Sequence, residues 1–134
     1  MESSQNAETS TAITNMTEYF KTHDIAYVAE NAVFRNMTTK EEVKGREAIK
    51  EMLHHIYHVA FDAKAEVINT LITENKALLE ATFSGKHIGE FAGVAATNKI
   101  VSVPLCVTYD LNSEGLIQTA RIYMLADVMM QQLK

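Results

Sequence analysis

The residues best suited to chemistry lie close together between positions 83 and 99, where His87 stands in a glycine-rich segment. Three glycines punctuate this segment: Gly85, Gly89 and Gly93. Glycines at this density let the backbone turn sharply where a side chain would clash, and an ordinary hairpin needs only one or two of them. Because the turn also carries the carboxylate of Glu90 and the ring of Phe91, we interpret it as the rim of a pocket.

His87 is predicted to face inward from its strand. Strand alternation places it on the same side as Leu79, Ala81 and Phe83, and that side is apolar. An inward imidazole at the mouth of a pocket can act as a general acid or base. The alternative is a rim histidine that only hydrogen-bonds a carbonyl group of the turn.

The last long strand contributes a second group of candidates. Strand alternation places Arg121 and Tyr123 on the same face as Ile117 and Thr119. Arginine is a fixed cation that could hold a substrate carboxylate or an enolate oxygen, and the Tyr123 hydroxyl could donate to the same oxygen. The alternative places Arg121 on the surface against a dimer partner and Tyr123 in the core, since alternation does not say which face is inward. His87, Arg121 and Tyr123 are the predicted catalytic residues.

A run of histidines at residues 54–58, His-His-Ile-Tyr-His, places His54 and His58 one helical turn apart, a spacing that can bind a metal. Two ligands are too few, and the zinc-hydrolase pattern His-Glu-x-x-His is absent because position 55 is histidine. We predict no metal and no cofactor, since the sequence also lacks a Gly-rich phosphate loop and a nucleotide fingerprint. The histidines are interpreted as partly exposed side chains of a helix face.

Three segments together resemble one family. Residues 83–99, Phe-Ser-Gly-Lys-His-Ile-Gly-Glu-Phe-Ala-Gly-Val-Ala-Ala-Thr-Asn-Lys, are similar to the segment Gly/Thr-x-His-x-Gly-Glu-Phe-x-Gly-x-Pro-Ala-Thr-Gly-Lys/Arg of SnoaL-like proteins. These form the polyketide cyclase and "ester cyclase" branch of the nuclear transport factor 2-like superfamily. Residues 45–49 (Gly-Arg-Glu-Ala-Ile) resemble the start of that family's long helix, and residues 115–117 (Gly-Leu-Ile) resemble the start of its last long strand. Ala95 and Asn98 depart from the family's proline and glycine.

The resemblance implies an α+β fold: a conical half-open barrel in which a curved, mostly antiparallel sheet wraps around a long helix and N-terminal helices, with a pocket inside. Related ketosteroid isomerases place a catalytic acid after a Pro-x pair in the middle of one strand, where this chain has Pro104-Leu105 followed by Cys106. Characterised cyclases of the family rely on an aspartate from the C-terminal strands, whereas residues 116–126 contain no acid. We interpret Cys106 as a core cysteine beside the pocket.

Hydrophobic periodicity predicts helices first and long strands afterwards, which is an α+β order with helices on one face of a largely antiparallel sheet. Helices are expected at residues 12–21, 24–30 (with Asp24 as N-cap), 45–60 and 126–134, and strands at residues 32–36, 63–73, 77–87, 99–111 and 116–125. Residues 1–10 are predicted to be a polar lead-in, and residues 11–134 a single SnoaL-like domain.

The composition limits the class of function. With 47% hydrophobic and 22% charged residues in a chain of 134, the protein is an ordinary globular domain. A net charge of −5 argues against a nucleic-acid groove, which needs a concentrated basic patch. The single cysteine excludes an internal disulfide. Because neither a signal peptide nor a membrane-spanning apolar run is evident, we predict a cytoplasmic protein without a membrane partner.

Three functions remain open at this stage. The first is an enzyme of cyclase, isomerase or hydrolase type that acts on a small apolar carbonyl compound by acid/base chemistry. The second is a non-catalytic protein that binds a hydrophobic small molecule, and the third is a dimerisation module whose pocket is filled by its own side chains. The predicted ligand-binding residues are Met52, Leu53, Ile56, Tyr57, Phe83, Phe91 and Cys106.

A homodimer formed through the sheet is also predicted. Apolar residues occupy both faces of the last two strands, and only one face can cover the pocket. The residues that motivate this are Val101, Val103 and Val107 for one face, and Leu116, Ile122 and Met124 for the other.

Overall fold

The computed structural model describes the backbone of residues 2–134 and the side chains of residues 11–134. Helices and strands follow one another in the expected α+β order. They are α1 (Glu2–Thr22), the 3₁₀ turn η1 (Ile25–Tyr27), β1 (Val28–Asn36), β2 (Glu42–Lys44), α2 (Arg46–His54), the π-helical turn η2 (His55–Val59), β3 (Phe61–Ile72), β4 (Lys76–His87), β5 (Ile100–Leu111), β6 (Ile117–Met124) and α3 (Ala126–Leu133).

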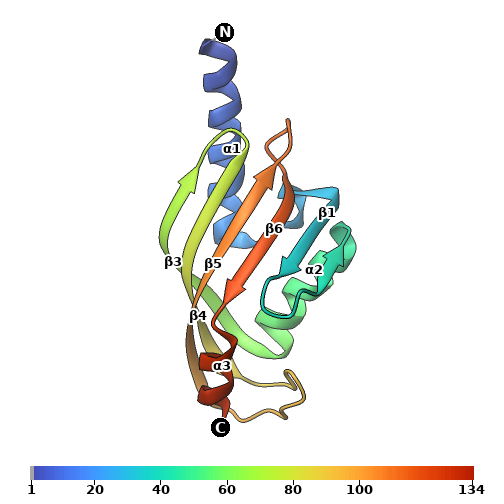
Figure 1. Ribbon diagram of the computed structural model, residues 1–134, viewed down its shortest axis with the longest axis vertical. Coiled ribbons are helices and arrows are strands. Elements are labelled where there is room, and N and C mark those ends of the chain that lie inside the picture. Colours follow the sequence, from blue (N-terminus) through green and yellow to red (C-terminus); the bar gives the residue numbers. More distant parts are fainter. Residues whose placement is uncertain (1) are drawn as a thin grey trace.

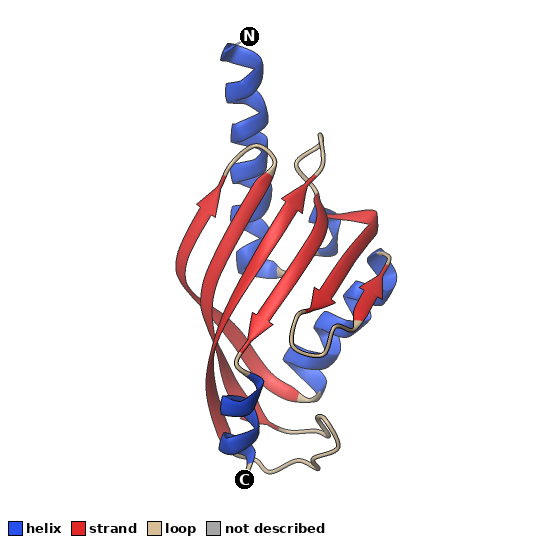
Figure 2. Cartoon of the chain, viewed as in Figure 1, coloured by secondary structure: helices blue, strands red, loops and turns tan. Residues whose placement is uncertain are grey.

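The strands form one curved sheet in the order β2-β1-β6-β5-β4-β3 (Figure 1). Neighbouring strands run antiparallel, except that β1 and β6 are parallel. Figure 2 shows α1 and α2 on the same side of the sheet, behind it in this view. Helix α3 lies at the lower end of the sheet, next to β5. The predicted α+β fold with a curved, mostly antiparallel sheet is confirmed.

Aromatic packing fixes α1 across the concave face of the sheet. The rings of Tyr19 and Phe20 lie 6.1 and 5.8 Å from the ring of Tyr109 on β5. All three side chains are buried, and aromatic pairs at these distances add specific geometry to the burial of apolar area. The inner face of the sheet and the buried face of α1 therefore share one core.

Three helices differ from their expected limits. The short helix expected over residues 24–30 is only the turn η1, because β1 already begins at Val28. Helix α1 begins at Glu2 rather than at Ala12, so residues 2–10 continue the helix; the division into a lead-in and a domain stays a prediction. The single helix expected over residues 45–60 is divided into α2 and η2, where the Ala60 N–H donates to the His55 carbonyl at 2.7 Å. Such π turns widen a helix and are frequent at functional sites. Asp24 does cap the short turn that follows it, because its Oδ1 accepts from the Ala26 N–H at 2.9 Å.

The glycines of residues 83–99 mainly allow close backbone contact. A Cβ atom on Gly85 would lie 2.3 Å from the Asp62 carbonyl oxygen, and one on Gly89 would lie 2.4 Å from that of Val59. Gly93 alone among the three has a positive φ, of 81°, and has open space around it. The expectation of a sharp turn applies to Gly93, whereas Gly85 and Gly89 are needed because no side chain fits there.

The loop after β4 is held against the end of η2. The Ala60 carbonyl accepts from the N–H groups of Ile88 and Gly89 at 2.9 and 3.0 Å. Phe91 and Val94 then form a small antiparallel bridge. These bonds place the Phe91 ring over the open end of the sheet.

None of the helices in the described part of the chain combines the length and the hydropathy that crossing a bilayer requires. The cytoplasmic location inferred from the sequence stays a prediction.

The close approach of β3 and β4 can be tested at Gly85. We expect Gly85→Ala to destabilise the fold by about 2 kcal/mol or more, because the new methyl group would meet backbone atoms of β3 that cannot move away cheaply. Urea unfolding followed by circular dichroism measures this change. The neighbouring Ser84→Ala, which adds no atom, should cost less than about 1 kcal/mol, and equal costs for the two variants would contradict the contact.

Candidate functional site

A cavity of about 300 Å³ lies between the helices and the concave face of the sheet. Its walls are predominantly aromatic and aliphatic, with a few polar side chains among them, as is typical of small-molecule sites. The lining residues are Tyr19, His23, Phe34, Asn36, Met52, Leu53, His55, Ile56, Tyr57, Leu79, Phe83, Phe91, Leu105, Val107, Tyr109, Ile122 and Met124. We call this space the cone cavity.

Six of the seven residues expected to line a pocket do line the cone cavity: Met52, Leu53, Ile56, Tyr57, Phe83 and Phe91. Whether they bind a ligand stays a prediction. Cys106 is the exception, because it alternates with the inward-facing Leu105 and Val107 on β5 and so points to the outer face of the sheet. There it lines a separate shallow groove together with Tyr123.

The predicted convergence of Arg121 and Tyr123 on the pocket is wrong. Both lie on the outer face of β6. The residues that alternate with them, Ile122 and Met124, line the cone cavity. The cause is a register shift between β5 and β6, where Leu111 pairs with Ile117 but Asp110 pairs with Thr119. Such a bulge changes the parity of the strand, so alternation counted from Ile117 assigns Arg121 to the wrong face.

Arg121 belongs to an ion-pair network on that outer face. Its Nη2 donates to Oδ2 of Asp110 at 2.8 Å, and the Lys76 Nζ donates to Oδ1 of the same carboxylate at 2.7 Å. The hydrogen bond from Lys76, followed by that from Arg121, lowers the pKa of Asp110 against the opposing effect of burial. These contacts are structural and lie away from the cone cavity.

His87 is fully buried, as predicted, but it lies one ring behind the cavity wall. Its ring is 5.1 Å from the ring of Phe61, which in turn packs against the cavity-lining Phe83 and Phe91. Its Nδ1 accepts from the Thr97 N–H at 3.1 Å and lies 3.0 Å from the Thr97 Oγ1, while Nε2 has no hydrogen-bond partner within the described side chains. His87 thereby fastens the loop of residues 88–99 to β4.

Two of the described histidines line the cone cavity, His55 and His23; His55 is exposed, whereas His23, just after α1, is half-buried. Its N–H donates to the Tyr19 carbonyl at 2.7 Å and its φ is 53°, a left-handed conformation that non-glycine residues rarely adopt. The ring stacks on that of Tyr57 with centroids 4.7 Å apart, and meets the edge of the Tyr19 ring at 5.3 Å. In the sequence, the helical pattern breaks at His23-Asp24. This break indicates the end of a helix, but it does not indicate that His23 lines a cavity.

Burial shifts the pKa values of four polar groups of this cavity toward the neutral form of each group. It raises the pKa of Tyr57 to about 12 and also raises the pKa values of Tyr19 and Tyr109, so all three hydroxyls remain protonated at neutral pH. Burial, and secondly the charge of His58, lowers the pKa of His23. Within residues 11–134, none of the three tyrosine hydroxyls has a hydrogen-bond partner. The cavity therefore offers unused hydroxyl donors beside a neutral imidazole that can accept a proton.

His54 and His58 lie outside the cone cavity. The rings of His54 and His58 lie 5.4 Å apart on the exposed side of α2 and η2. Among the side chains that the structure describes, no three His, Cys, Asp or Glu residues gather closely enough to hold a metal ion.

A curved sheet closed by helices around an apolar cavity with a few polar groups defines a small-molecule pocket fold. The chain belongs to the SnoaL-like polyketide cyclase family, whose model matches residues 11–133. No curated protein matches the chain in sequence.

Solved structures share the fold at low sequence identity. A protein from Jannaschia sp. CCS1, described as a SnoaL-like polyketide cyclase, is 16% identical with a TM-score of 0.81, and 92% of each chain is covered. A protein from Silicibacter sp. TM1040, described as a polyketide cyclase, is 18% identical with a TM-score of 0.81, over 92% of this chain and 95% of the other. AclR from Streptomyces galilaeus, described as a hydroxylase, is 23% identical with a TM-score of 0.70, over 95% of this chain and 81% of the other.

The environment of His23 can be tested by its titration. We expect the pKa of His23 to lie below that of an exposed histidine, and to rise part of the way back in His58→Gln, because this variant removes one of the two causes of the shift. Two-dimensional NMR of the ring carbons measures both values. His54→Gln, one turn earlier, is the matched control and should leave the pKa of His23 unchanged.

The same shift predicts how stability depends on pH. Because the folded state holds a neutral His23 with a lowered pKa, the unfolded state takes up the proton first as the pH falls. Stability is therefore expected to decrease as the pH falls through about 6.5, less steeply in His23→Asn, where the titrating group is gone. A steeper decrease in that variant would contradict the buried, neutral His23.

Proposed function

We propose that the chain binds a small, largely apolar molecule with a carbonyl oxygen in the cone cavity, and that His23 acts on it as a general acid or base. The observation that carries the proposal is the neutral imidazole stacked on Tyr57 in an apolar cavity whose tyrosine hydroxyls are unpartnered. A buried base with hydrogen-bond donors nearby is the arrangement that proton abstraction next to a carbonyl group requires.

The roles follow from the chemistry of each group. A tyrosine hydroxyl of the cavity wall donates to the ligand's carbonyl oxygen and stabilises the negative charge that develops there. His23, neutral before reaction, accepts the proton from the adjacent carbon and can return it at another position or to another atom. No cofactor takes part in this scheme. Aldol-type cyclase and isomerase reactions share this proton transfer, whereas in a hydrolase the same base would take its proton from water. Family membership supports the class without naming the reaction.

A non-catalytic binding function is the second candidate. It is favoured by the predominance of apolar side chains in the cavity wall and by the lack of a carboxylate among the described residues that line it. Carboxylates are, with histidine, the usual bases for such proton transfers. The two candidates differ in whether bound ligand exchanges protons.

The proposal can be tested with 2-acetonaphthone, an apolar aromatic methyl ketone. We expect it to bind, measured by calorimetry, and to exchange its methyl protons in D₂O faster than in buffer, measured by NMR. His23→Asn should retain binding and reduce exchange about 100-fold, the lower end of what a general base contributes, while asparagine still tolerates the left-handed backbone. Ile122→Phe should abolish both, because it fills the cavity.

The outcomes separate the two candidates. Binding without exchange in the wild type, or exchange that is unchanged in His23→Asn, would contradict catalysis and leave the binding function. Binding that persists in Ile122→Phe would contradict the cone cavity as the site. The exposed Ile68→Phe on the outer face is the matched control and should alter neither.

We also propose a homodimer formed through the outer face of the sheet. Most of the residues that suggested it from sequence do not lie there, since Val101, Val103 and Val107 are buried and Ile122 lines the cone cavity; Met124 lines both the cone cavity and the outer groove. The outer face instead carries exposed apolar side chains around a groove of about 590 Å³: Ile68, Tyr123 and Leu125. Exposed apolar surface of this kind favours a self-complementary contact between two copies.

This dimer can be tested by substituting Tyr123. We expect the wild type to be a dimer at micromolar concentration by light scattering, and Tyr123→Glu to shift it toward monomer, because it would bury an unpaired charge at the contact. Ile13→Glu, an equally apolar-to-charged change at an exposed position of α1, should leave the dimer intact. A wild-type monomer, or a dimer insensitive to Tyr123→Glu, would contradict the proposal.

A further inference from the structure

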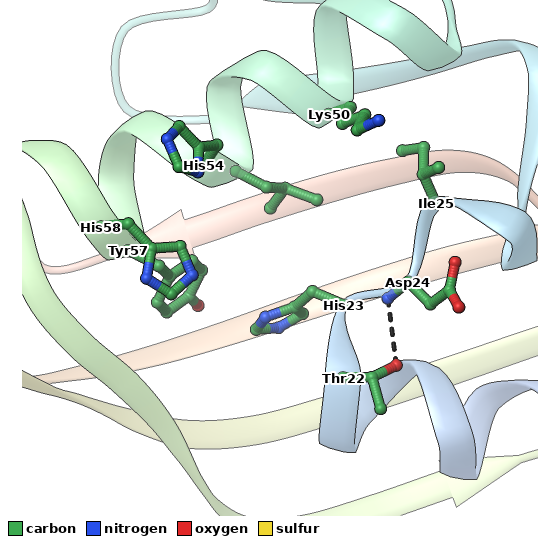
Figure 3. Close-up of a pocket in the computed structure, with 9 residues that line it drawn as sticks. Thr22, His23, Asp24, Ile25, Lys50, His54, Tyr57 and His58 are labelled. Atoms are coloured by element: carbon green, nitrogen blue, oxygen red, sulfur yellow. Dashed lines mark hydrogen bonds between the residues drawn. The ribbon is translucent and has the colours of Figure 1, made fainter.

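A second cavity of about 350 Å³ adjoins the cone cavity on the side of the helices. It lies between the turn at residues 22–25 and the helix face that carries Lys50, His54 and His58, and we call it the vestibule (Figure 3). His23, Leu53 and Tyr57 line both cavities, so the two spaces meet at the imidazole that the proposed function uses.

One wall of the vestibule is basic. Lys50, His54 and His58 recur at intervals of four residues, which places them on one face of α2 and η2. The rings of His54 and His58 are 5.4 Å apart, and both side chains are exposed. From the opposite wall the His23 ring reaches toward His58 and Tyr57, as Figure 3 shows.

Asp24 is the one acid among the described residues that line the vestibule, and part of it is engaged elsewhere. The Oδ1 atom of Asp24 caps η1, because it accepts from the Ala26 N–H at 2.9 Å. The backbone N–H of Asp24 donates to the Thr22 Oγ1 at 3.1 Å. In Figure 3 its carboxylate points away from the imidazole rings, on the side where Lys50 lies. The remaining titratable groups that face the cavity are His23, Tyr57 and the two helix histidines.

From this arrangement we infer that the vestibule binds an anionic group carried by the same ligand whose apolar body occupies the cone cavity. The inference rests on the proposed function for the position of that apolar body. A carboxylate between His23 on one wall and His54 and His58 on the other could accept hydrogen bonds from several imidazoles at once. The ligand class is therefore an amphipathic carboxylic acid rather than a neutral apolar compound.

Binding of the acid should strengthen as the pH falls. Histidine is the side chain whose charge ordinarily changes between pH 5 and 8, whereas a ligand carboxylate stays ionised over most of that range. Among the described residues that line the vestibule, Lys50 is the one lysine or arginine and Asp24 the one carboxylate. Positive charge on the helix histidines attracts the ligand carboxylate, in competition with Glu47 and Glu51, which border Lys50 and His54 in the adjoining hollow.

The test compares 2-naphthylacetic acid with 2-naphthylacetamide, which have nearly the same shape and differ in charge. By calorimetry in the presence of EDTA, the wild type should bind the acid roughly fivefold more tightly than the amide at about pH 5.5, as expected for partly exposed charge pairs. The preference should fall to less than about twofold near pH 7.5, because histidine ordinarily carries less charge at that pH.

Variants assign the preference to the vestibule. His54→Gln/His58→Gln should remove the preference for the acid at the lower pH while changing the affinity for the amide less than about twofold, because both side chains are exposed and lie outside the cone cavity. Lys50→Met should weaken acid binding at both pH values. Lys86→Met, an exposed lysine away from both cavities, is the matched control and should change neither ligand.

The outcomes also separate this inference from the proposed function. If the amide binds and is blocked by Ile122→Phe, but the acid binds no better in the wild type, the vestibule does not take an anion and the proposed function stands. A preference for the acid that survives in His54→Gln/His58→Gln would likewise overturn the inference. If neither compound binds, the apolar cavity itself is not the site, and the proposed function fails together with the inference.

Discussion

The register of β6 against β5 decides which side chains face the cone cavity. Beside Asp110 the two strands shift by one residue, and every later side chain of β6 changes face. Ile122 and Met124 consequently complete the apolar wall, whereas Arg121 and Tyr123 point to the outer face. Without the shift a guanidinium group would stand in the cavity, and the ligand class, the ion pair and the outer apolar surface would all be different.

Two irregular backbone segments supply the polar wall opposite the sheet. His23 adopts a left-handed conformation at the end of α1, and Tyr57 lies in the π turn that ends the long helix. Residues held in sparsely populated conformations typically cost about 1–3 kcal/mol, and they persist only where surrounding contacts hold them. Here the stacking of the two rings at 4.7 Å, and the edge contact with Tyr19, provide those contacts. Both irregularities lie where the two cavities meet.

The sequence predicts what depends on local pattern. The helical stripe places Met52, Leu53 and Ile56 correctly in the cavity wall, because their spacing alone determines the buried face. The sequence does not predict which face of β6 points inward, because the bulge in β6 arises from its pairing with β5. The sequence also does not identify His23. Its role depends on the ring of Tyr57, which lies 34 residues later in the chain and stacks on His23 only in the folded protein.

Burial is the main cause that prepares both halves of the proposed chemistry, and the charge of His58 adds to it at His23. An apolar environment disfavours whichever form of a group is charged, so it raises the pKa of Tyr57 and lowers that of His23. The same cavity therefore keeps a hydroxyl donor protonated and an imidazole free to accept a proton, without a carboxylate to orient either of them. A purely aliphatic cavity would hold a ligand with no directional preference. The unpartnered hydroxyls and the neutral imidazole instead favour one ligand orientation, with its oxygen toward the tyrosines and its acidic carbon toward His23.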